Sequence, residues 1–268
     1  MLWKTGSLHV SQHRGYALAN ELITLGGHSL TGLDRDGTWK VNTPLVGWFG
    51  RPQPKSSMDD LVNADGVQVV PVEYGSRLIT INGRVSSRRH EYLHEAAGLL
   101  SALGFRGDTV LQVSGHGPAQ WARVWPRGEV QVDFVTDTYM TYQLQLEAPD
   151  PFKYGEKRTE SFALGGSGQV MHRGSVPAWP VVTVTGSAPG GYTLTRAGRD
   201  VTVTAPLVSG QPHTLDMRTG VLRAGGSRVY GAISTAQYWT VAPGLRQTVT
   251  ASGTGTATVR VDVYDTWI

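Results

Sequence analysis

One motif in the sequence has the residue types and spacing of a metal-dependent hydrolase. His90-Glu91-Tyr92-Leu93-His94 matches the pattern H-E-x-x-H. On a helix, histidines four positions apart project to the same side and can fill two tetrahedral positions of a zinc ion, while the glutamate acts as general base. The site still needs a third ligand, and the extended motif fails because Ala97 and Leu100 stand where it requires glycine and histidine.

The competing interpretation of this motif is a solvated helix face. His90, Glu91, His94 and Glu95 fall together on one side of the helix that their neighbours predict, and such charged faces are common. We therefore predict no metal and no cofactor, and we keep His90 and His94 as alternative candidate metal ligands.

Other chemistry has little support in the sequence. The chain has no cysteine, which excludes disulfides and thiolate catalysis, and it has no G-x-S-x-G nucleophile elbow. No glycine-rich loop opens a helix to cradle a phosphate. Two tryptophans, Trp179 and Trp239, could stack on a sugar ring, although such residues more often pack in a core. The sequence thus predicts no catalytic residue.

The elements that would position these residues are mostly strands. In the first half, Leu78–Val85 alternates, with Ile79, Ile81 and Val85 on one face. Tyr139–Ala148 places Met140, Tyr142, Leu144 and Leu146 on one face in the same way. Further strands are predicted at Val67–Tyr74, Thr109–Ser114, Ala119–Trp125 and Val130–Thr136.

One segment has helical spacing instead. Between about Arg89 and Leu103 the apolar residues share one arc of a helix, and Gly104 is suited to end it. The predicted inward residues are Tyr92, Leu93, Ala96, Leu99, Leu100 and Leu103.

The second half of the chain has the pattern of a β-sandwich. Short strands recur at the spacing typical of sandwiches, and Thr256–Tyr264 is the clearest, with Ala257, Val259, Val261 and Val263 on one face. The other predicted strands are Pro180–Gly186, Tyr192–Arg196, Asp200–Ala205, Gly220–Arg223, Gln237–Val241 and Arg246–Ala251.

Charge divides the chain in two. Residues 1–158 carry 16 basic and 16 acidic side chains, whereas residues 159–268 carry 8 and 5, so the charged fraction falls in the second part. We predict one domain at 1–155 and a second at 156–268, whose last strand can return toward the first. The net charge of +3 is too small to indicate a nucleic-acid binder.

The sequence shows no membrane span, and residues 1–10 lack the apolar stretch of a signal peptide. We therefore expect the protein to stay in the cytoplasm of the producing cell until it is used.

Several segments, taken in order, resemble the distal tail proteins of long-tailed, non-contractile bacteriophages. Each is short, and their order and spacing carry the resemblance across most of the chain. They are Tyr74–Arg77 leading into Leu78–Val85, the helix that follows, Leu144–Phe152, Gly174–Pro180 leading into Val181–Gly186, Pro243–Leu245, and Val263–Trp267. An excess of 19 arginines over 5 lysines suits a high-GC host such as an actinobacterium.

The resemblance implies a fold, an assembly and a set of partners. The first domain would be a β-barrel or sandwich with one helix that forms a hexameric ring continuous with the tail tube, and the second a galectin-like sandwich projecting outward. The expected neighbours are the tail tube protein above and the tail hub below, with tape-measure and receptor-binding proteins nearby. DNA would pass through the lumen without specific binding, no membrane insertion is expected, and the protein would be a virion component at the tail tip, not an enzyme.

Two other functions remain open at this point. One is a carbohydrate-binding adhesion module that uses Trp179 and Trp239. The other is a zinc peptidase that uses His90, Glu91 and His94.

Overall fold

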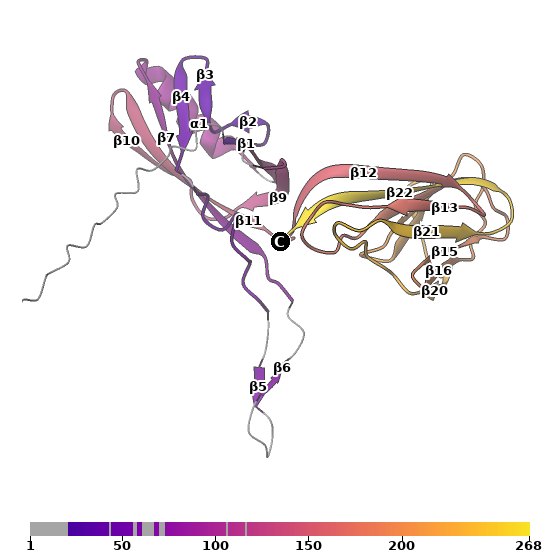
Figure 1. The fold of residues 1–268 in the computed structure, drawn as a ribbon. Helices are drawn as coiled ribbons and strands as arrows, with labels where there is room; N and C mark the ends of the chain where they lie inside the picture. The colour runs from indigo at the N-terminus through magenta and orange to yellow at the C-terminus, as the bar shows by residue number, and fades with distance from the viewer. Residues whose placement is uncertain are drawn as a thin grey trace, which may run out of the picture.

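The computed structural model describes residues 21–42, 44–55, 58–60, 67–69, 73–105, 107–115 and 117–268. In these ranges the protein consists of strands and one helix, and every pair of strands is antiparallel. This confirms the predicted mainly-β class with a single helix (Figure 1). No helix in the described ranges is long and apolar enough to cross a membrane.

The first core comprises the buried side chains between Ile23 and Ala148. Its main strands, β7 (Arg77–Ser87) and β11 (Tyr139–Ala148), pair along their length, from Tyr139 opposite Ser86 to Ala148 opposite Arg77. The other strands on this side are β1 (Leu22–Leu25), β2 (His28–Ser29), β3 (Gly32–Asp34), β4 (Gly37–Val41), β5 (Met58–Asp60), β6 (Val67–Val69), β8 (Thr109–Ser114), β9 (Gln120–Pro126) and β10 (Gln131–Thr136).

The alternation predicted for the two long strands is confirmed. Ile79, Ile81 and Val85 of β7 are buried while Leu78 is exposed, and Met140, Tyr142, Leu144 and Leu146 of β11 are all buried. The bounds of β8 and β11 are those predicted. Of the strand predicted at Val67–Tyr74, Val67–Val69 forms β6, which pairs with β5, and residues 70–72 lie outside the described ranges.

The helix α1 (His90–Ala102) packs against β7 and ends as the sequence predicts. Gly104 follows it with a φ of 71°, a left-handed conformation that glycine adopts without steric cost. Tyr92, Leu93, Ala96 and Leu100 face the core. The inward placement of Leu99 was wrong: it lies at the edge of the apolar arc and is 36% exposed, while Leu103 is partly buried.

Tyr92 fixes α1 onto the hairpin of β3 and β4. Its hydroxyl accepts a hydrogen bond from Trp39 Nε1 (3.0 Å) and donates one to the carboxylate of Asp34 (2.9 Å). A Cβ at Gly37 would lie 2.1 Å from the tyrosine ring, so only glycine allows this close approach.

The second core comprises the buried side chains between Val170 and Val263. Its strands are β12 (Lys153–Ala163), β13 (Ser167–Val170), β14 (Val181–Ser187), β15 (Tyr192–Arg196), β16 (Arg199–Val203), β17 (His213–Asp216), β18 (Val221–Ala224), β19 (Ser227–Val229), β20 (Ile233–Ala236), β21 (Gln247–Ser252) and β22 (Thr256–Trp267). One sheet has the order β13-β21-β15-β16-β20; the order β19-β18-β17-β14-β22-β12 belongs to a larger sheet that continues through β9 into the first-core strands.

The strand predicted at Gln237–Val241 was wrong. The regular strand there is β20, which ends at Ala236, and Val241 makes only an isolated bridge to Ala178. Ala257, Val259, Val261 and Val263 of β22 are buried as predicted.

Two long strands connect the two cores. β12 pairs with β22 from Ala163 opposite Thr258 to Lys153 opposite Trp267, and Tyr154 of β12 also pairs with Trp121 of β9. Residues 155 and 156, where we placed the domain boundary, therefore lie inside a strand. Figure 1 shows β12 and β22 running side by side away from the strands of the first core.

Candidate functional site

The two histidines of the H-E-x-x-H motif lie side by side on the exposed face of α1. Their Nε2 atoms are 3.0 Å apart, and their rings meet edge to face at 4.7 Å. The Nδ1 of His90 is 3.3 Å from the backbone carbonyl oxygen of Asp137, and the ring of His94 lies 4.7 Å from that of Phe134 on β10. The helix thus brings His90 and His94 together as the spacing predicts.

The structure does not complete a peptidase site around this pair. Within the described ranges, no group of three or more histidine, cysteine, aspartate or glutamate side chains could hold a metal ion. The third ligand that a catalytic zinc needs is therefore lacking in this part of the chain.

The two candidate sugar-stacking tryptophans have opposite environments. Trp239 is completely buried in the second core, so neither face of its indole can receive a sugar, and its assignment as a sugar platform was wrong. Trp179 is 40% exposed beside buried Ala178 and stays a candidate.

The sequence did not reveal a buried arginine at the start of β7. Arg77 is 1% exposed, and its hydrogen bonds to other described residues all go to backbone carbonyl oxygens. Its Nη1 donates to the oxygens of Gly47, Trp48 and Gly50, and its Nε donates to that of Pro151 at 3.0 Å. Its Nη2 is buried with no hydrogen-bond partner. Burial lowers the pKa of Arg77. The alternation of β7 could have predicted this burial, because residues two apart in a strand share a face and Arg77 is therefore on the same face as buried Ile79 and Ile81.

A second buried cation shares one of these acceptors. Lys153, at the start of β12, is 4% exposed, and its Nζ donates to the Trp48 carbonyl oxygen at 3.0 Å. Burial, with a smaller contribution from the positive charge of Arg77, lowers the pKa of Lys153 to about 8. Arg77 and Lys153 together tie the segment at Trp48 to the point where the chain enters the second half. We call Arg77, Lys153 and Trp48 the cationic junction.

A hydrogen-bonded ion pair reinforces this region from the other side. Arg218, just after β17, donates to the carboxylate of Asp150 at 2.5 Å, and the Tyr154 hydroxyl donates to the same carboxylate at 2.6 Å. The guanidinium of Arg218 also lies over the ring of Phe152 at 5.6 Å. A loop of the second-core side is thereby fixed to the segment that leaves β11.

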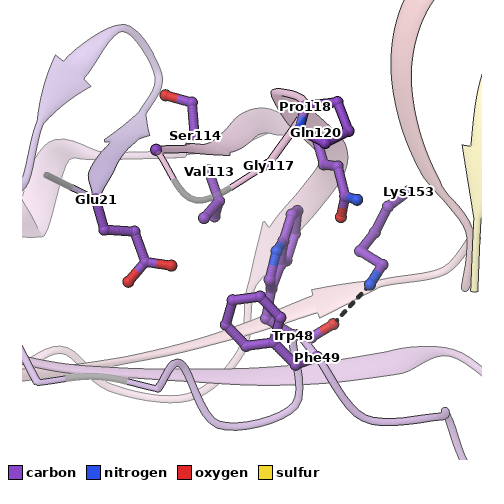
Figure 2. Close-up of a pocket in the computed structure, with 10 residues that line it drawn as sticks. Glu21, Trp48, Phe49, Val113, Ser114, Gly117, Pro118, Gln120 and Lys153 are labelled. Carbon is purple, nitrogen blue, oxygen red and sulfur yellow. Dashed lines mark hydrogen bonds between the residues drawn. The ribbon is translucent and has the colours of Figure 1, made fainter. Parts of the chain in front are cut away.

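A pocket of about 310 Å³ opens beside the cationic junction (Figure 2). In Figure 2 the Glu21 carboxylate points in from one side, and Lys153 stands on the other with its hydrogen bond to Trp48. Glu21 Oε2 is buried without a hydrogen-bond partner, and Phe49 is 58% exposed. The pocket is lined by Glu21, Trp48, Phe49, Val113, Ser114, Gly115, Gly117, Pro118, Gln120 and Lys153. This lining can bind a small dipolar or apolar group, and among the hydrogen bonds of the described residues none joins the Ser114 hydroxyl to Glu21 or Lys153.

Two open strand edges form another surface of the first-core side. β3 pairs with β4 alone, and β10 pairs with β11 alone, among the described strands. Leu33 of β3 is 89% exposed and Val135 of β10 is 53% exposed. Val135 is the extra residue of a bulge, since Phe134 pairs with Met140 and Thr136 with Tyr139. Exposed edges of this kind are available for pairing with another chain.

The sequence matches no protein-family model and no curated protein. The fold, in contrast, resembles solved structures. It is similar to the SPP1 Dit protein, described as a paradigm of the hub adsorption apparatus in phages that infect Gram-positive bacteria. The TM-score is 0.69 and the sequence identity 14%, and the match covers 92% of this chain and 99% of that chain. Two structures of the phage p2 baseplate in its activated conformation, with Ca and with Sr, also match, with TM-scores of 0.47 and 0.46, 6% and 7% identity, and coverage of 90% of this chain and 97% of theirs.

The likeness to SPP1 Dit shows the fold of this chain. It extends through both cores, because the match covers 92% of this chain. The mainly-β arrangement with one helix is therefore a Dit-like fold.

Proposed function

We propose that this protein is a structural subunit of a bacteriophage tail, placed at the distal end, where it joins the tail tube to the tail tip or baseplate hub. The observation that supports this most is the end-to-end likeness to SPP1 Dit, a hub protein by its description. A virion component of this kind needs no catalytic group, and we propose no enzymatic activity and no cofactor.

In this proposal the two halves of the chain have different roles. Residues 1–155 form a ring around a lumen that lets DNA pass, and residues 156–268 form a galectin-like domain directed outward. The partners are the tail tube protein above, the tail hub below, and tape-measure and receptor-binding proteins nearby. The protein is assembled in the host cytoplasm. The actinobacterial host rests on arginine excess alone.

The open edges of the first-core sheet support a closed ring. β3 and β10 lie at the two ends of the strand series β3-β4-β7-β11-β10. Pairing of one edge with the opposite edge of the next copy is a heterologous contact, and such contacts make a ring when the rotation between copies closes. We propose six copies, joined through β10 and β3.

The mass of the purified protein in solution tests this proposal. Light scattering should give about six times 28.9 kDa. Val135→Lys should reduce the hexamer, because lysine on an edge strand opposes pairing. Val208→Lys is a matched control, since Val208 is 55% exposed on the second-core side and Val135 is 53% exposed. A strict monomer at tens of micromolar would contradict the ring, and a hexamer unaffected by Val135→Lys would contradict the β10 edge.

Gene order gives an independent test of the tail assignment. We expect a long tape-measure gene directly upstream and a tail-hub gene directly downstream. A locus without tail genes on either side would argue against a virion protein.

Carbohydrate binding is a second candidate function, favoured by the exposure of Trp179. Glycan-array binding that disappears in Trp179→Ala would support an adhesion role for the second half. Trp125→Ala is the control, because Trp125 is 41% exposed on the first-core side. No binding by the wild-type protein, or binding unaffected by Trp179→Ala, would exclude a role for this residue.

A further inference from the structure

The histidine pair of α1 has the geometry of a chelating site, although the tail function does not require one. We propose that His90 and His94 bind a divalent transition-metal ion, with Ni²⁺ and Cu²⁺ preferred over oxygen-seeking ions such as Mg²⁺. Imidazole nitrogens favour late transition metals, while Mg²⁺ prefers oxygen ligands. This proposal stands independently of the ring.

The distance between the two nitrogens fits this ligand set. Metal–imidazole bonds are about 2.0–2.1 Å long, so two nitrogens at 90° around one ion are about 3.0 Å apart, and at a tetrahedral angle about 3.4 Å. The Nε2 atoms of His90 and His94 are 3.0 Å apart. The spacing of the pair therefore matches two adjacent positions of a square-planar or octahedral ion, and on binding each ring turns so that its lone pair points at the ion instead of at the other nitrogen.

The surroundings of His90 set the correct tautomer. Its Nδ1–H donates to the Asp137 carbonyl oxygen, and this leaves the lone pair of Nε2 directed at His94. A metal-binding histidine usually donates its second ring N–H to such an acceptor, which orients the ring. Without metal, His94 Nε2–H donates to His90; on binding, the proton moves to His94 Nδ1 through water, and both Nε2 lone pairs face the ion.

The ring of His94 is held in place by a neighbouring strand. It lies 4.7 Å from the Phe134 ring at an angle of 32°, and α1 is anchored by the bonds of Tyr92 to Trp39 and Asp34. Both imidazoles are thus positioned before an ion arrives, which lowers the entropic cost of chelation. The described residues supply two ligands, so water fills the other positions, and the site binds a metal without forming the three-ligand centre of a zinc peptidase.

Metal titration of the full chain, without an affinity tag and after treatment with a chelator, tests the site. By calorimetry, Ni²⁺ should bind with one tight ion per chain, and Mg²⁺ should not bind. His90→Gln and His94→Gln should each weaken Ni²⁺ binding roughly 10-fold or more, a loss of the size seen when even an outer partner of a metal ligand is removed. Phe134→Leu should weaken it by a smaller factor.

The control variant is Glu91→Gln, which removes the charge of the residue that follows His90 in the sequence and should leave Ni²⁺ affinity unchanged. Circular dichroism checks that each variant is folded. The double variant His90→Gln/His94→Gln measures the Ni²⁺ binding that comes from the six other histidines. Equal Ni²⁺ affinity of wild type and double variant would overturn the proposal. A loss in Glu91→Gln as large as in His94→Gln would overturn the two-histidine ligand set.

Discussion

The two cores bury similar aliphatic side chains but differ in the apolar surface around them. Among the described residues, eleven of the sixteen exposed large hydrophobic side chains precede Asp150, and five follow it. The two open edge strands, β3 and β10, also precede Asp150. The first-core side therefore exposes more large apolar side chains and more open strand edge than the second-core side, as the proposed ring would require.

Buried polar groups show a second difference. The second-core side pairs its buried acids internally: Asp265 accepts hydrogen bonds from Arg158 and from the backbone of Arg173, and Asp262 binds Thr159 and Lys157. The buried cations Arg77 and Lys153 instead rely on carbonyl oxygens at the border between the cores. We infer that the cationic junction holds the border together at a cost in desolvation, and the predictions below test this difference.

Arg77→Ala should have the largest effect, a loss of about 4 kcal/mol in the free energy of unfolding of the first-core side. It leaves the carbonyl oxygens of Gly47, Trp48, Gly50 and Pro151 without this donor, and buried groups that lose a charged partner are costly. Hydrogen exchange should show lost protection in β7 and retained protection in β14. Arg84→Ala, at an exposed position of the same strand, should change stability by less than about 0.5 kcal/mol. Equal loss in β7 and β14 would contradict separable cores.

Gly174→Ala should destabilise the second-core side by about 3 kcal/mol. The new Cβ would lie 1.9 Å from the backbone oxygen of Thr266 on β22, a contact that only a backbone shift can relieve. Gly190→Ala is the control, because its Cβ would meet nothing closer than 3.7 Å. Denaturant unfolding of both variants measures the difference. Similar midpoints would mean that the backbone at the end of β22 shifts easily to make room for the new Cβ.

Lys153 should make stability depend on alkaline pH. Its pKa is lowered in the folded protein from 10.5 to about 8, so between these values the unfolded chain binds more protons, and stability should rise with pH by about 3 kcal/mol. Below pH 8 both states are protonated, and the contribution is constant. Lys153→Met should remove this rise, whereas Lys40→Met, at an exposed position of β4, should keep it. An unchanged pH profile in Lys153→Met would show that Lys153 is well solvated.

Gly98→Ala should produce the smallest effect, a gain of about 0.5–1 kcal/mol. Gly98 lies inside α1, and a Cβ there meets nothing within 4 Å, so alanine lowers the entropy of the unfolded chain without a clash. Thermal unfolding measures the gain. A loss of stability in Gly98→Ala would contradict this expectation, because it would mean that the face of α1 at Gly98 is packed against a neighbour.

The sequence predicted strands best where one face is buried. The parity of β7, β11 and β22 follows directly from alternating apolar residues, and the spacing of α1 follows from its apolar arc. β12 was missed because its residues are mostly polar on both faces: its stability comes from pairing with β22, a partner about 100 residues away in sequence. Gln237–Val241 failed for the opposite reason, since Trp239 and Val241 are buried without a regular strand.

The candidate site was predictable only in part. Spacing alone placed His90 and His94 together, because i and i+4 are neighbours on any helix. Their contacts with Asp137 and Phe134, the burial of Arg77 and Lys153, and the pocket of Figure 2 depend on which strands pair, and local pattern does not contain that information.

The bulge at Val135 also bears on aggregation. A long, regular edge strand is a template for indefinite growth, and copies that expose one can add to each other as fibres. Here β10 is interrupted at Val135 and β3 is only three residues long, so neither edge offers a continuous ladder to an arbitrary strand. Random edge contacts between copies therefore gain few hydrogen bonds, and only a strand that matches the interruption gains the full set.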